Sequence, residues 1–312
     1  MIYVTGATGH IGNNIVRMLV DSGYETTSLV RRVSPAIKNI NAPILVGDIF
    51  QSDWLSTILQ ENDVLIHSAG VIDLTRADRS ESAKVNVEGT KTILAVCAAK
   101  GAYLLFVSSV DAIEKPKSGG LIATPDETTL NGVKSHYSMM KAIAAKEVAV
   151  AIATHSISGA IVYPAAVIGP YDFKPSRVGK ELLAIQKRKV VFDLNGGYCF
   201  IDVRDVAKAI VRIVALRATG HYILGAHNVT IRSFYKTIER VTKRKLIILP
   251  IPVAVAKIGC LFFKSYSAVM IDAVKENHEY DTSPMRQELG IDPRPFEVSV
   301  KDTLEWFQNQ TK

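Results

Sequence analysis

The amino-acid sequence predicts an α/β fold, a doubly wound parallel β-sheet with a smaller second domain towards the C-terminus. Two observations lead to this fold class. Short β-rich runs alternate with helix-compatible stretches through the first half of the chain, and a triplet of glycines lies between the first run and the first stretch. Alternation of this kind is typical of parallel sheets that helices cover on both faces.

The expected strands are short runs rich in apolar and β-branched residues. They are Ile2–Thr5, Thr26–Val30, Ile44–Val46, Val64–His67, Tyr103–Val107 and residues 160–162. The helix-compatible stretches between them are residues 11–20, 83–100 and 135–154.

The second half of the chain has a looser pattern. A helical run over residues 178–189 is followed by a return to the sheet domain. We therefore expect a sheet domain over residues 1–165 with a return segment at about 200–226, and a second domain formed mainly by residues 166–312.

Composition limits the classes of function. Apolar residues make up 48% and charged residues 21% of the chain, as in globular proteins with a hydrophobic core. The net charge of +7 is spread along the sequence, and the basic runs 187–189 and 243–245 are expected to be solvated faces. Because no dense basic stripe with interleaved aromatic residues is present, we expect no nucleic-acid partner.

The cysteines and histidines indicate neither disulfides nor a metal. Cys97, Cys199 and Cys260 are isolated, and the seven histidines form no pair at helical metal-ligand spacing. This pattern is consistent with a reducing, cytoplasmic location. The chain opens directly on an expected strand, so no signal peptide is predicted.

The apolar segment 246–263 is close to the lower length limit for a membrane span. Pro250 and Pro252 interrupt it, and Lys257 lies within it. A buried helix or an apolar flap over a pocket is therefore favoured over peripheral membrane contact.

The glycine triplet is the strongest local signal, because it follows the first strand and opens the first helix. Glycine is needed there since a side chain would block the tight turn and the approach of a pyrophosphate. The helix N-terminus adds free N–H groups and a partial positive charge. The arrangement predicts a dinucleotide site, whose expected contacts are Gly6, Thr8, Gly9, His10, Ile11 and Gly12.

The end of the second strand bears on the choice of dinucleotide. NAD-binding proteins usually place Asp or Glu there to accept from the ribose hydroxyls. This chain has Arg31 and Arg32, and a guanidinium can pair bidentately with a 2′-phosphate. NADP(H) is therefore expected to be preferred, with NAD(H) possible; the alternative is that both arginines are ordinary surface charges.

Later strand ends supply further expected cofactor contacts, since ligands of parallel sheets bind outside the carboxyl ends of the strands. Asp48 and Ile49 follow the third strand and could contact adenine. The small residues that end the fourth strand, where the cofactor would pass, are Ser68, Ala69 and Gly70.

Tyr137 and Lys141 lie four residues apart, on one face of an expected helix. A nearby ammonium favours the phenolate and would bring the pKa of a tyrosine from about 10 towards neutrality, where it can exchange a proton with a substrate oxygen. Ser109, at the end of the fifth strand, could hydrogen-bond that oxygen or could cap a turn. Ser108 is expected to contact the cofactor.

The motifs in their order resemble extended short-chain dehydrogenase/reductases, which are NAD-dependent epimerase/dehydratase-like proteins, over nearly the whole chain. They are TGATGHIG at 5–12, GDI at 47–49, HSAG at 67–70, NVEGT at 86–90, SSV at 108–110, YSMMK at 137–141, YPAAVIGP at 163–170 and FIDVRDVA at 200–207. The resemblance implies an NADP-binding Rossmann domain and a C-terminal substrate-binding domain.

The same resemblance implies roles for single residues. Tyr137 would be the general acid/base, Lys141 its activator and a ligand of the nicotinamide ribose, and Ser109 the hydroxyl that orients the substrate oxygen. Asn86 would hold the active-site helix and a relay water. Met140 departs from the serine common at its position, which is expected to alter packing and not chemistry. The residues expected against the nicotinamide are Tyr163, Pro164 and Val167.

Two substrate classes remain. The dihydroflavonol-reductase and 3β-hydroxysteroid-dehydrogenase-like branch, which the chain resembles, implies reduction of an apolar ketone or aldehyde to an alcohol, or the reverse. The alternative is a nucleotide-sugar epimerase or dehydratase that retains its cofactor. The arginines that usually pair with a diphosphate are missing, although other basic residues could replace them, namely Arg177, Lys180, Arg204 and Arg232.

Two further expectations concern assembly and class. The resemblance implies a possible homodimer, packed through the helices expected at 83–100 and 135–154. A cofactor-sensing binding protein without chemistry would usually lack the tyrosine or the lysine, and both are present here.

Overall fold

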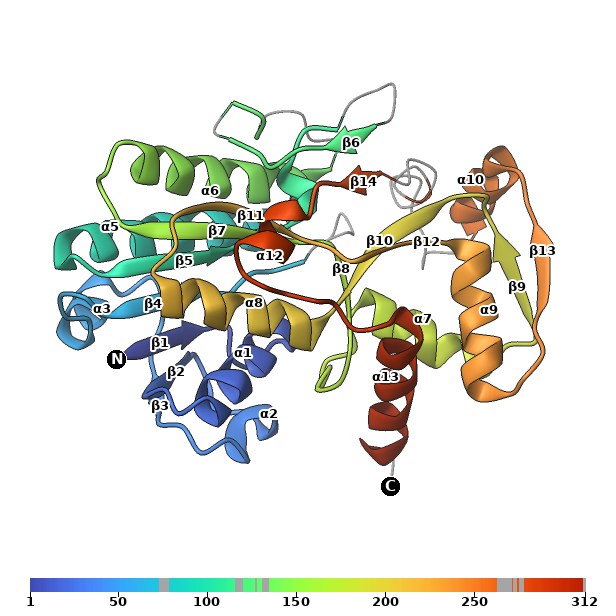
Figure 1. The fold of residues 1–312 in the computed structure, drawn as a ribbon, viewed down its shortest axis with the longest axis horizontal. Coiled ribbons are helices and arrows are strands. Elements are labelled where there is room, and N and C mark those ends of the chain that lie inside the picture. The colour runs from blue at the N-terminus through green and yellow to red at the C-terminus, as the bar shows by residue number, and fades with distance from the viewer. Residues whose placement is uncertain are drawn as a thin grey trace.

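A computed structural model of the protein describes residues 1–72, 79–115, 120–126, 128–130, 135–262, 271, 274 and 278–310. Its centre is a seven-stranded parallel sheet with the strand order β3-β2-β1-β4-β5-β7-β11 (Figure 1). The strands are β1 (Ile2–Thr5), β2 (Thr26–Val30), β3 (Ile44–Val46), β4 (Val64–His67), β5 (Tyr103–Val107), β7 (Gly159–Pro164) and β11 (Gly220–Leu224). The predicted fold class is confirmed, and five of the six expected strands have the expected bounds.

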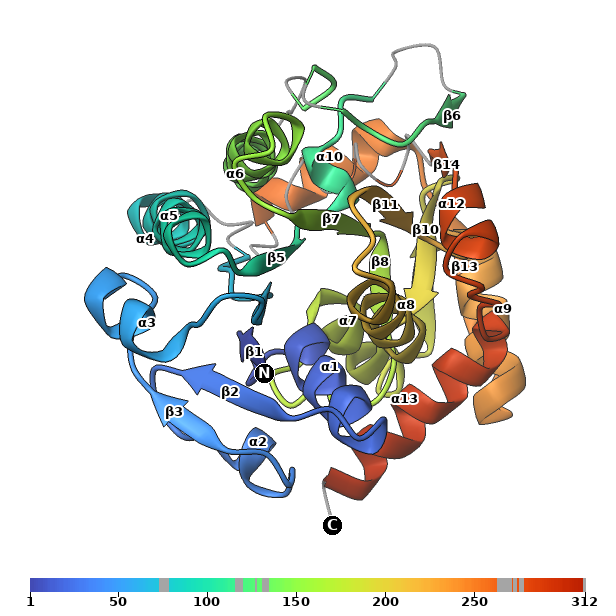
Figure 2. The same ribbon diagram turned by 60° about the vertical axis from the view of Figure 1, so that its left-hand side comes forward.

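Helices cover both faces of this sheet, which explains why its strands are apolar on both sides. One face carries α1 (His10–Asp21), α8 (Val203–Leu216) and the short α2 (Pro35–Lys38). The other carries α3 (Ser52–Ile58), α5 (Gly89–Lys100) and α6 (His136–Ala153). Figure 2 shows the two groups on opposite sides of the strands.

The helix expected over residues 83–100 is interrupted. Residues 79–83 form α4 (Arg79–Ala83), Lys84–Glu88 form a π-helical turn, and α5 follows. A π-helical turn holds an extra residue, which hydrophobic periodicity does not reveal and which is frequent at functional sites.

The remaining elements build a smaller region to the right of the main sheet in Figure 1. It contains a three-stranded sheet, β8 (Ala166–Ile168), β10 (Gly197–Asp202) and β12 (His227–Thr230), and a parallel pair, β9 (Val190–Asp193) and β13 (Ile247–Pro250). Its helices are α7 (Arg177–Ile185), α9 (Ile231–Thr242), α10 (Val253–Phe262) and α13 (Phe296–Gln310). The short α12 (Ser283–Gln287) packs instead against the main sheet beside β11. A further pair is β6 (Leu121–Ile122) with β14 (Glu279–Tyr280).

The apolar segment 246–263 is not a buried helix over its described part. Residues 247–250 form strand β13, and α10 begins only after Pro252. Ile247, Leu249 and Val255 are 57%, 43% and 55% exposed. Among the described residues no helix has the length and apolar character needed to cross a bilayer, and no cluster of metal-ligating side chains occurs.

Candidate active site

The expected site residues gather at the carboxyl ends of the main-sheet strands. The chain builds β1, β2 and β3 towards one edge and then returns to β4 on the other side of β1. Ligands of open α/β sheets bind where the strand order reverses in this way. The glycine turn after β1 and the small residues after β4 lie at that point.

The glycine turn has the geometry of a pyrophosphate site. Gly6 has φ of +72°, and a Cβ at this residue would lie 2.6 Å from the backbone nitrogen of Ala69. A Cβ at Gly12 would overlap the carbonyl of Gly6. Helix α1 begins after Gly9 with no side-chain cap and no acidic residue in its first turn. Its first N–H groups therefore remain available to an anion, which fits a dinucleotide phosphate.

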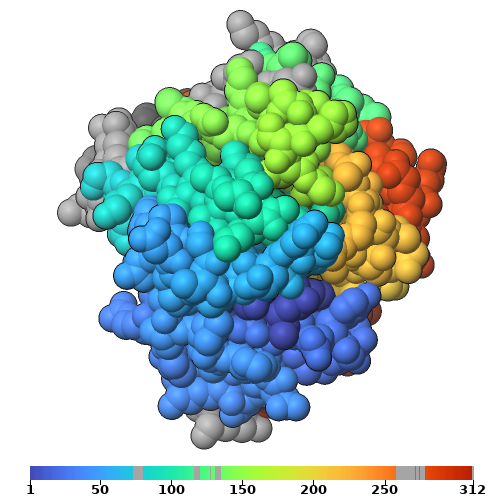
Figure 3. Space-filling view, turned by 90° about the vertical axis from the view of Figure 1, so that its left-hand side faces the viewer, coloured from blue at the N-terminus to red at the C-terminus, as the bar shows by residue number. Residues whose placement is uncertain are grey.

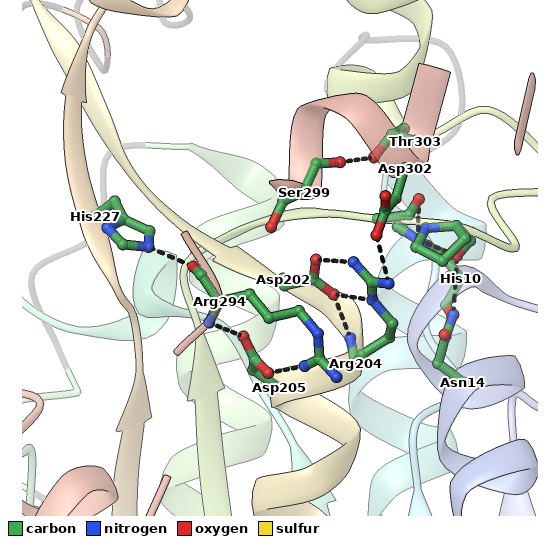
Figure 4. Close-up of polar contacts among 12 residues, drawn as sticks. His10, Asn14, Asp202, Arg204, Asp205, His227, Arg294, Ser299, Asp302 and Thr303 are labelled. Carbon is green, nitrogen blue, oxygen red and sulfur yellow. Dashed lines mark hydrogen bonds and ion pairs between the residues drawn. The ribbon is translucent and has the colours of Figure 1, made fainter. Parts of the chain in front are cut away.

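The His10 side chain binds a loop that lies outside the glycine motif. Its Nε2–H donates to the carbonyl oxygens of Gly169 (3.2 Å) and Pro170 (3.1 Å), and burial lowers its pKa. Asn14 also donates to the Pro170 carbonyl, at 3.1 Å. Figure 4 shows both side chains on α1. The His10 imidazole thus ties the glycine turn to the loop after β8, and contact of His10 with a cofactor stays a prediction.

The residues expected around adenosine lie after β2 and β3. Arg31 and Arg32 follow β2 directly and are exposed; within the part of the chain that the structure describes, neither forms an ion pair. Asp48 uses Oδ1 to accept from the Phe50 N–H at 3.2 Å. Ile49 packs against α5, where Gly89 makes room for its side chain.

Gly70, Asn86 and Lys141 converge beside the end of β4. A Cβ at Gly70 would lie 2.9 Å from Asn86 Oδ1 and 3.1 Å from Lys141 Nζ. Asn86 lies in the π-helical turn, donates to the Val71 carbonyl (2.8 Å) and accepts from the Val71 N–H (3.0 Å). Ser68 and Ala69 are half-buried and line the same edge.

A hydrogen-bonded chain that was not expected from the sequence links the glycine turn to Asn86. His67, fully buried, contacts Thr5 Oγ1 through Nδ1 (2.8 Å) and Thr90 Oγ1 through Nε2 (3.2 Å). Thr90 donates its one hydroxyl proton to the Asn86 carbonyl (2.8 Å), so it must accept from His67 Nε2–H. The Ala69 N–H in turn reaches Thr5 Oγ1 at 3.3 Å. The one feature of the sequence that could have indicated this hydrogen-bond network is a histidine, His67, at the end of an otherwise apolar strand.

His67 is expected to make the fold sensitive to acid. Burial, and then the charge of Lys141, lowers the pKa of His67 to about 3 from the usual 6.5. Between these pH values the unfolded chain binds a proton that the folded chain does not, so the free energy of unfolding falls as the pH drops, by up to about 1.4 kcal/mol per pH unit. Denaturant unfolding at several pH values gives the free energy of unfolding as a function of pH. This free energy should change less steeply with pH in His67→Gln than in the wild type, and an equal pH dependence would contradict the assignment.

Ser109, Tyr137 and Lys141, the residues expected to be catalytic, lie near one another. The Ser109 hydroxyl lies close enough to the Tyr137 phenol to lower its pKa, and Ser109 Oγ accepts from the Asp111 N–H at 3.1 Å, so Ser109 caps a turn beside the phenol. Tyr137 and Lys141 are both buried on α6. Lys141 Nζ donates to the Val107 carbonyl at 3.2 Å.

The pKa of Tyr137 differs from expectation. Burial, and then the nearby Asp111, raises the pKa of Tyr137, and the neighbouring Ser109 hydroxyl offsets only part of that rise. Burial lowers the pKa of Lys141 to about 8, which leaves the amine mainly protonated at neutral pH. The pair therefore consists of a neutral phenol and an ammonium, the form that can donate a proton.

The remaining residues predicted to contact the cofactor differ in how far their side chains are buried. Ser108 Oγ is buried and has no partner among the described residues, as expected of a side chain that awaits a ligand. Tyr163 is fully buried and contacts His221 Nδ1 at 3.0 Å. Pro164 is buried and Val167 is half-buried. Their contact with the nicotinamide stays a prediction.

Two ion-pair groups hold the C-terminal segments against this site (Figure 4). Asp202, whose side chain is fully buried, accepts from Arg204, which also pairs with Asp302 of α13 at 2.7 Å. Asp205 pairs with Arg294. Pairs between segments this far apart in the sequence are invisible to local pattern reading.

The chain is similar in sequence to a known protein family and to several relatives. Residues 2–225 match the NAD dependent epimerase/dehydratase family. The chain is 32% identical to a Synechocystis sp. protein provisionally named dihydroflavonol 4-reductase, over 98% of this chain and 94% of that protein. It is 27% identical to sterol demethylase protein B of Methylococcus capsulatus, over 98% of each. A shorter stretch, 30% of this chain and 27% of that protein, is 35% identical to the 3-beta-hydroxysteroid dehydrogenase of Mycolicibacterium neoaurum.

Solved structures share the architecture. The crystal structure of gox2253 superposes with a TM-score of 0.84 at 24% identity, covering 99% of this chain and 98% of that one. A Thermotoga maritima UDP-glucose 4-epimerase with UDP-glucose superposes with a TM-score of 0.79 at 20% identity, covering 100% and 99%. These likenesses show the fold. Since the family match and the nearly full-length relative agree, the chain belongs to the NAD dependent epimerase/dehydratase family of extended short-chain dehydrogenase/reductases.

Proposed function

We propose that this oxidoreductase uses NADP(H) to reduce a ketone or aldehyde of an apolar substrate to an alcohol, through Ser109, Tyr137 and Lys141. The observation that carries the proposal is the buried pair Tyr137 and Lys141 on α6, with Lys141 Nζ beside Gly70 and the Tyr137 phenol kept neutral by burial. A neutral phenol beside a hydroxyl donor can protonate an oxygen that gains negative charge.

The cofactor, when bound, would supply the hydride for the carbonyl carbon. The glycine turn and the start of α1 would hold its pyrophosphate. Tyr137 would give its proton to the carbonyl oxygen, and Ser109 would hydrogen-bond that oxygen while its charge develops. Lys141, next to Gly70 and Asn86, would favour the phenolate that Tyr137 becomes.

Cofactor preference would depend on Arg31 and Arg32, which are exposed beyond the end of β2. Replacing Arg31 or Arg32 with alanine is expected to raise KM for NADPH by roughly 10- to 100-fold, because one or two charge-assisted hydrogen bonds to a phosphate are lost. KM for NADH serves as the internal control and should stay within about twofold. An equal rise for both cofactors, or no change for either, would contradict a role in 2′-phosphate binding.

Two observations favour an apolar substrate over a nucleotide sugar. Of the basic residues that could replace a diphosphate clamp, Arg204 is bound to Asp202 and Asp302, and Arg232 pairs with Asp193 at 2.9 Å. Breaking such pairs to bind a diphosphate would leave buried carboxylates without a partner. The names of the relatives, a dihydroflavonol reductase, a sterol demethylase protein and a hydroxysteroid dehydrogenase, refer to apolar ring systems.

The direct test is cofactor consumption by the purified protein with a panel of flavanonols, ketosteroids and aromatic aldehydes. Net, carbonyl-dependent loss of NADPH that exceeds loss of NADH would support the proposal. Tight nicotinamide binding without net turnover of any carbonyl would favour the nucleotide-sugar alternative, because an epimerase returns its hydride within each cycle.

A homodimer through α5 and α6 is part of the proposal. The two helices contact each other and lie side by side, teal and light green, on the face shown in Figure 3. Helix α6 exposes Met139 (45%), Ile143 (38%) and Val150 (43%), whose spacing places them on one stripe. Ile143→Lys is expected to shift the protein from dimer to monomer in sedimentation velocity, and a wild-type protein that sediments as a monomer would refute this arrangement.

A further inference from the structure

The parallel pair β9–β13 turns an apolar face towards solvent. Val190 and Phe192 of β9 are 40% and 53% exposed, and Ile247 and Leu249 of β13 are 57% and 43% exposed. The register pairs Val190 with Ile247 and Phe192 with Leu249, so the four side chains form one block. The opposite face packs into the core of the smaller region through Val191 and Ile248.

Helix α10 follows β13 in the chain and exposes further apolar side chains. It begins three residues after the end of β13, and Val255 in its first turns is 55% exposed. Ala254 is exposed as well. Exposed apolar residues that occur singly need no explanation, but a contiguous group indicates a surface that binds something.

Six cations stand at one end of the same face. The exposed runs 187–189 (Lys-Arg-Lys) and 243–245 (Lys-Arg-Lys) directly precede β9 and the residue before β13. Because the strands are parallel, both runs lie at the same end, and the Arg244 guanidinium donates to the backbone carbonyls of Gln186 and Arg188 across the gap. Glu181, 3.6 Å from Arg188, and Glu239, close to Lys245, offset only part of this charge.

We propose that this β9–β13 surface, formed by residues 187–192 and 243–249, docks on an anionic lipid bilayer. A lipid–water interface offers an apolar layer and a negatively charged layer side by side, which matches an apolar block bordered by cations. A nucleic acid would use the cations but leave the apolar block in water. A second copy packed through the same face would bring the two sets of six cations near each other, since a two-fold interface is self-complementary.

The proposal differs from the expectation drawn from the sequence, in which the basic runs are solvated faces and segment 246–263 is a buried helix or a flap. Pairing of β9 with β13 brings the two basic runs together and exposes the alternate apolar residues of both strands. Because no described helix can cross a bilayer, the attachment is peripheral. A small apolar block and a cluster of cations bind reversibly and in a salt-sensitive way.

The test is co-sedimentation of the full-length protein with vesicles. One set contains phosphatidylcholine alone, and the other contains phosphatidylcholine with phosphatidylglycerol. The wild-type protein is expected to sediment with the second set at low salt and to be released at high salt. Lys187→Glu combined with Lys189→Glu should lower the partition coefficient by roughly tenfold or more, and Phe192→Ser combined with Leu249→Ser should abolish binding to the same vesicles.

Matched variants control for charge and hydrophobicity elsewhere. Lys100→Glu combined with Lys208→Glu changes the net charge equally on other helices, and Leu216→Ser removes a side chain that is 50% exposed at the end of α8. Both should bind like the wild type, and circular dichroism checks that every variant is folded.

Three outcomes would overturn the proposal: no binding to anionic vesicles, equal loss of binding in the control variants, or a wild-type dimer that Phe192→Ser with Leu249→Ser converts to monomer without any vesicle binding. None of these measurements uses catalysis, so the proposed carbonyl reduction and the lipid surface can fail independently.

Discussion

Replacing Tyr137 with phenylalanine is expected to lower kcat for carbonyl reduction by roughly 10²- to 10⁴-fold, the usual contribution of a positioned general acid. The Tyr137 phenol is the proposed proton donor, and phenylalanine keeps the ring while it removes the proton. Tyr137 is buried, and because phenylalanine retains its ring, the substitution should change the packing around it little. Steady-state NADPH oxidation with the best carbonyl of the panel measures the effect.

Two controls separate chemistry from folding in that experiment. Leu216→Ala alters a side chain that is 50% exposed at the end of α8 and should leave kcat within about twofold, as is usual for surface substitutions. NADPH binding, followed by fluorescence, should be the same in Tyr137→Phe and in the wild type. A Tyr137→Phe enzyme that keeps more than a tenth of the wild-type kcat would remove Tyr137 from the role of proton donor.

Arg204→Ala is expected to reduce the free energy of unfolding by about 3–5 kcal/mol, the cost of leaving a buried charge without its partner. The Asp202 carboxylate accepts from the Arg204 backbone N–H (2.8 Å), Nε (2.9 Å) and Nη2 (2.7 Å). Burial alone would raise the pKa of Asp202, but the hydrogen bonds from Arg204 and Ser299 outweigh burial and hold it below its usual value. The variant would therefore hold a buried carboxyl group without its cationic partner, with the backbone N–H of residue 204 as a remaining donor.

An exposed ion pair of the same type supplies the control. Arg240 and Glu297 are 3.0 Å apart with side chains 58% and 52% exposed, so Arg240→Ala should cost no more than about 1 kcal/mol. Urea unfolding of both variants gives the comparison. Equal and small losses of unfolding free energy would mean that Arg204 does not stabilise Asp202. A large loss only for Arg204→Ala would support the stabilising role of Arg204, which also joins α8 to α13 through Asp302.

The main sheet was predictable because each of its strands is an apolar run bounded by turn residues. Buried parallel strands leave this signature in the sequence itself, and the bounds of β1 to β5 coincide with the expected ones. The strands of the smaller region have no such apolar pattern in the sequence. β9 and β13 are four residues each and pair across more than fifty residues of chain, so neither could be recognised before its partner was known.

The apolar segment 246–263 shows the limit of hydropathy. Ile247 and Leu249 are apolar, but their burial depends on which face of β13 packs inward, and that is set by tertiary contacts. The π-helical turn was missed for a related reason, since one extra residue in a helix shifts the periodicity without removing it.

Local motifs predict the members of the candidate site, and the structure places Ser109, Lys141 and Asn86 close to the ends of β4 and β5. Their catalytic roles stay predictions. The sequence could not reveal that the His10 imidazole binds the loop after β8, or that His67 joins the glycine turn to the Asn86 carbonyl. Both depend on hydrogen bonds between segments whose distance in space no spacing rule supplies.

The π-helical turn at Lys84–Glu88 makes the number of residues in this stretch a constraint, separate from their identity. Deleting one residue there would let α4 and α5 merge into a regular α-helix. Everything on the N-terminal side would turn by about 100° about the helix axis relative to α5. Asn86 could then not reach Val71 while α5 kept its buried face against the sheet. Alignments of relatives that share this architecture should therefore show substitutions between residues 79 and 100, but no gap.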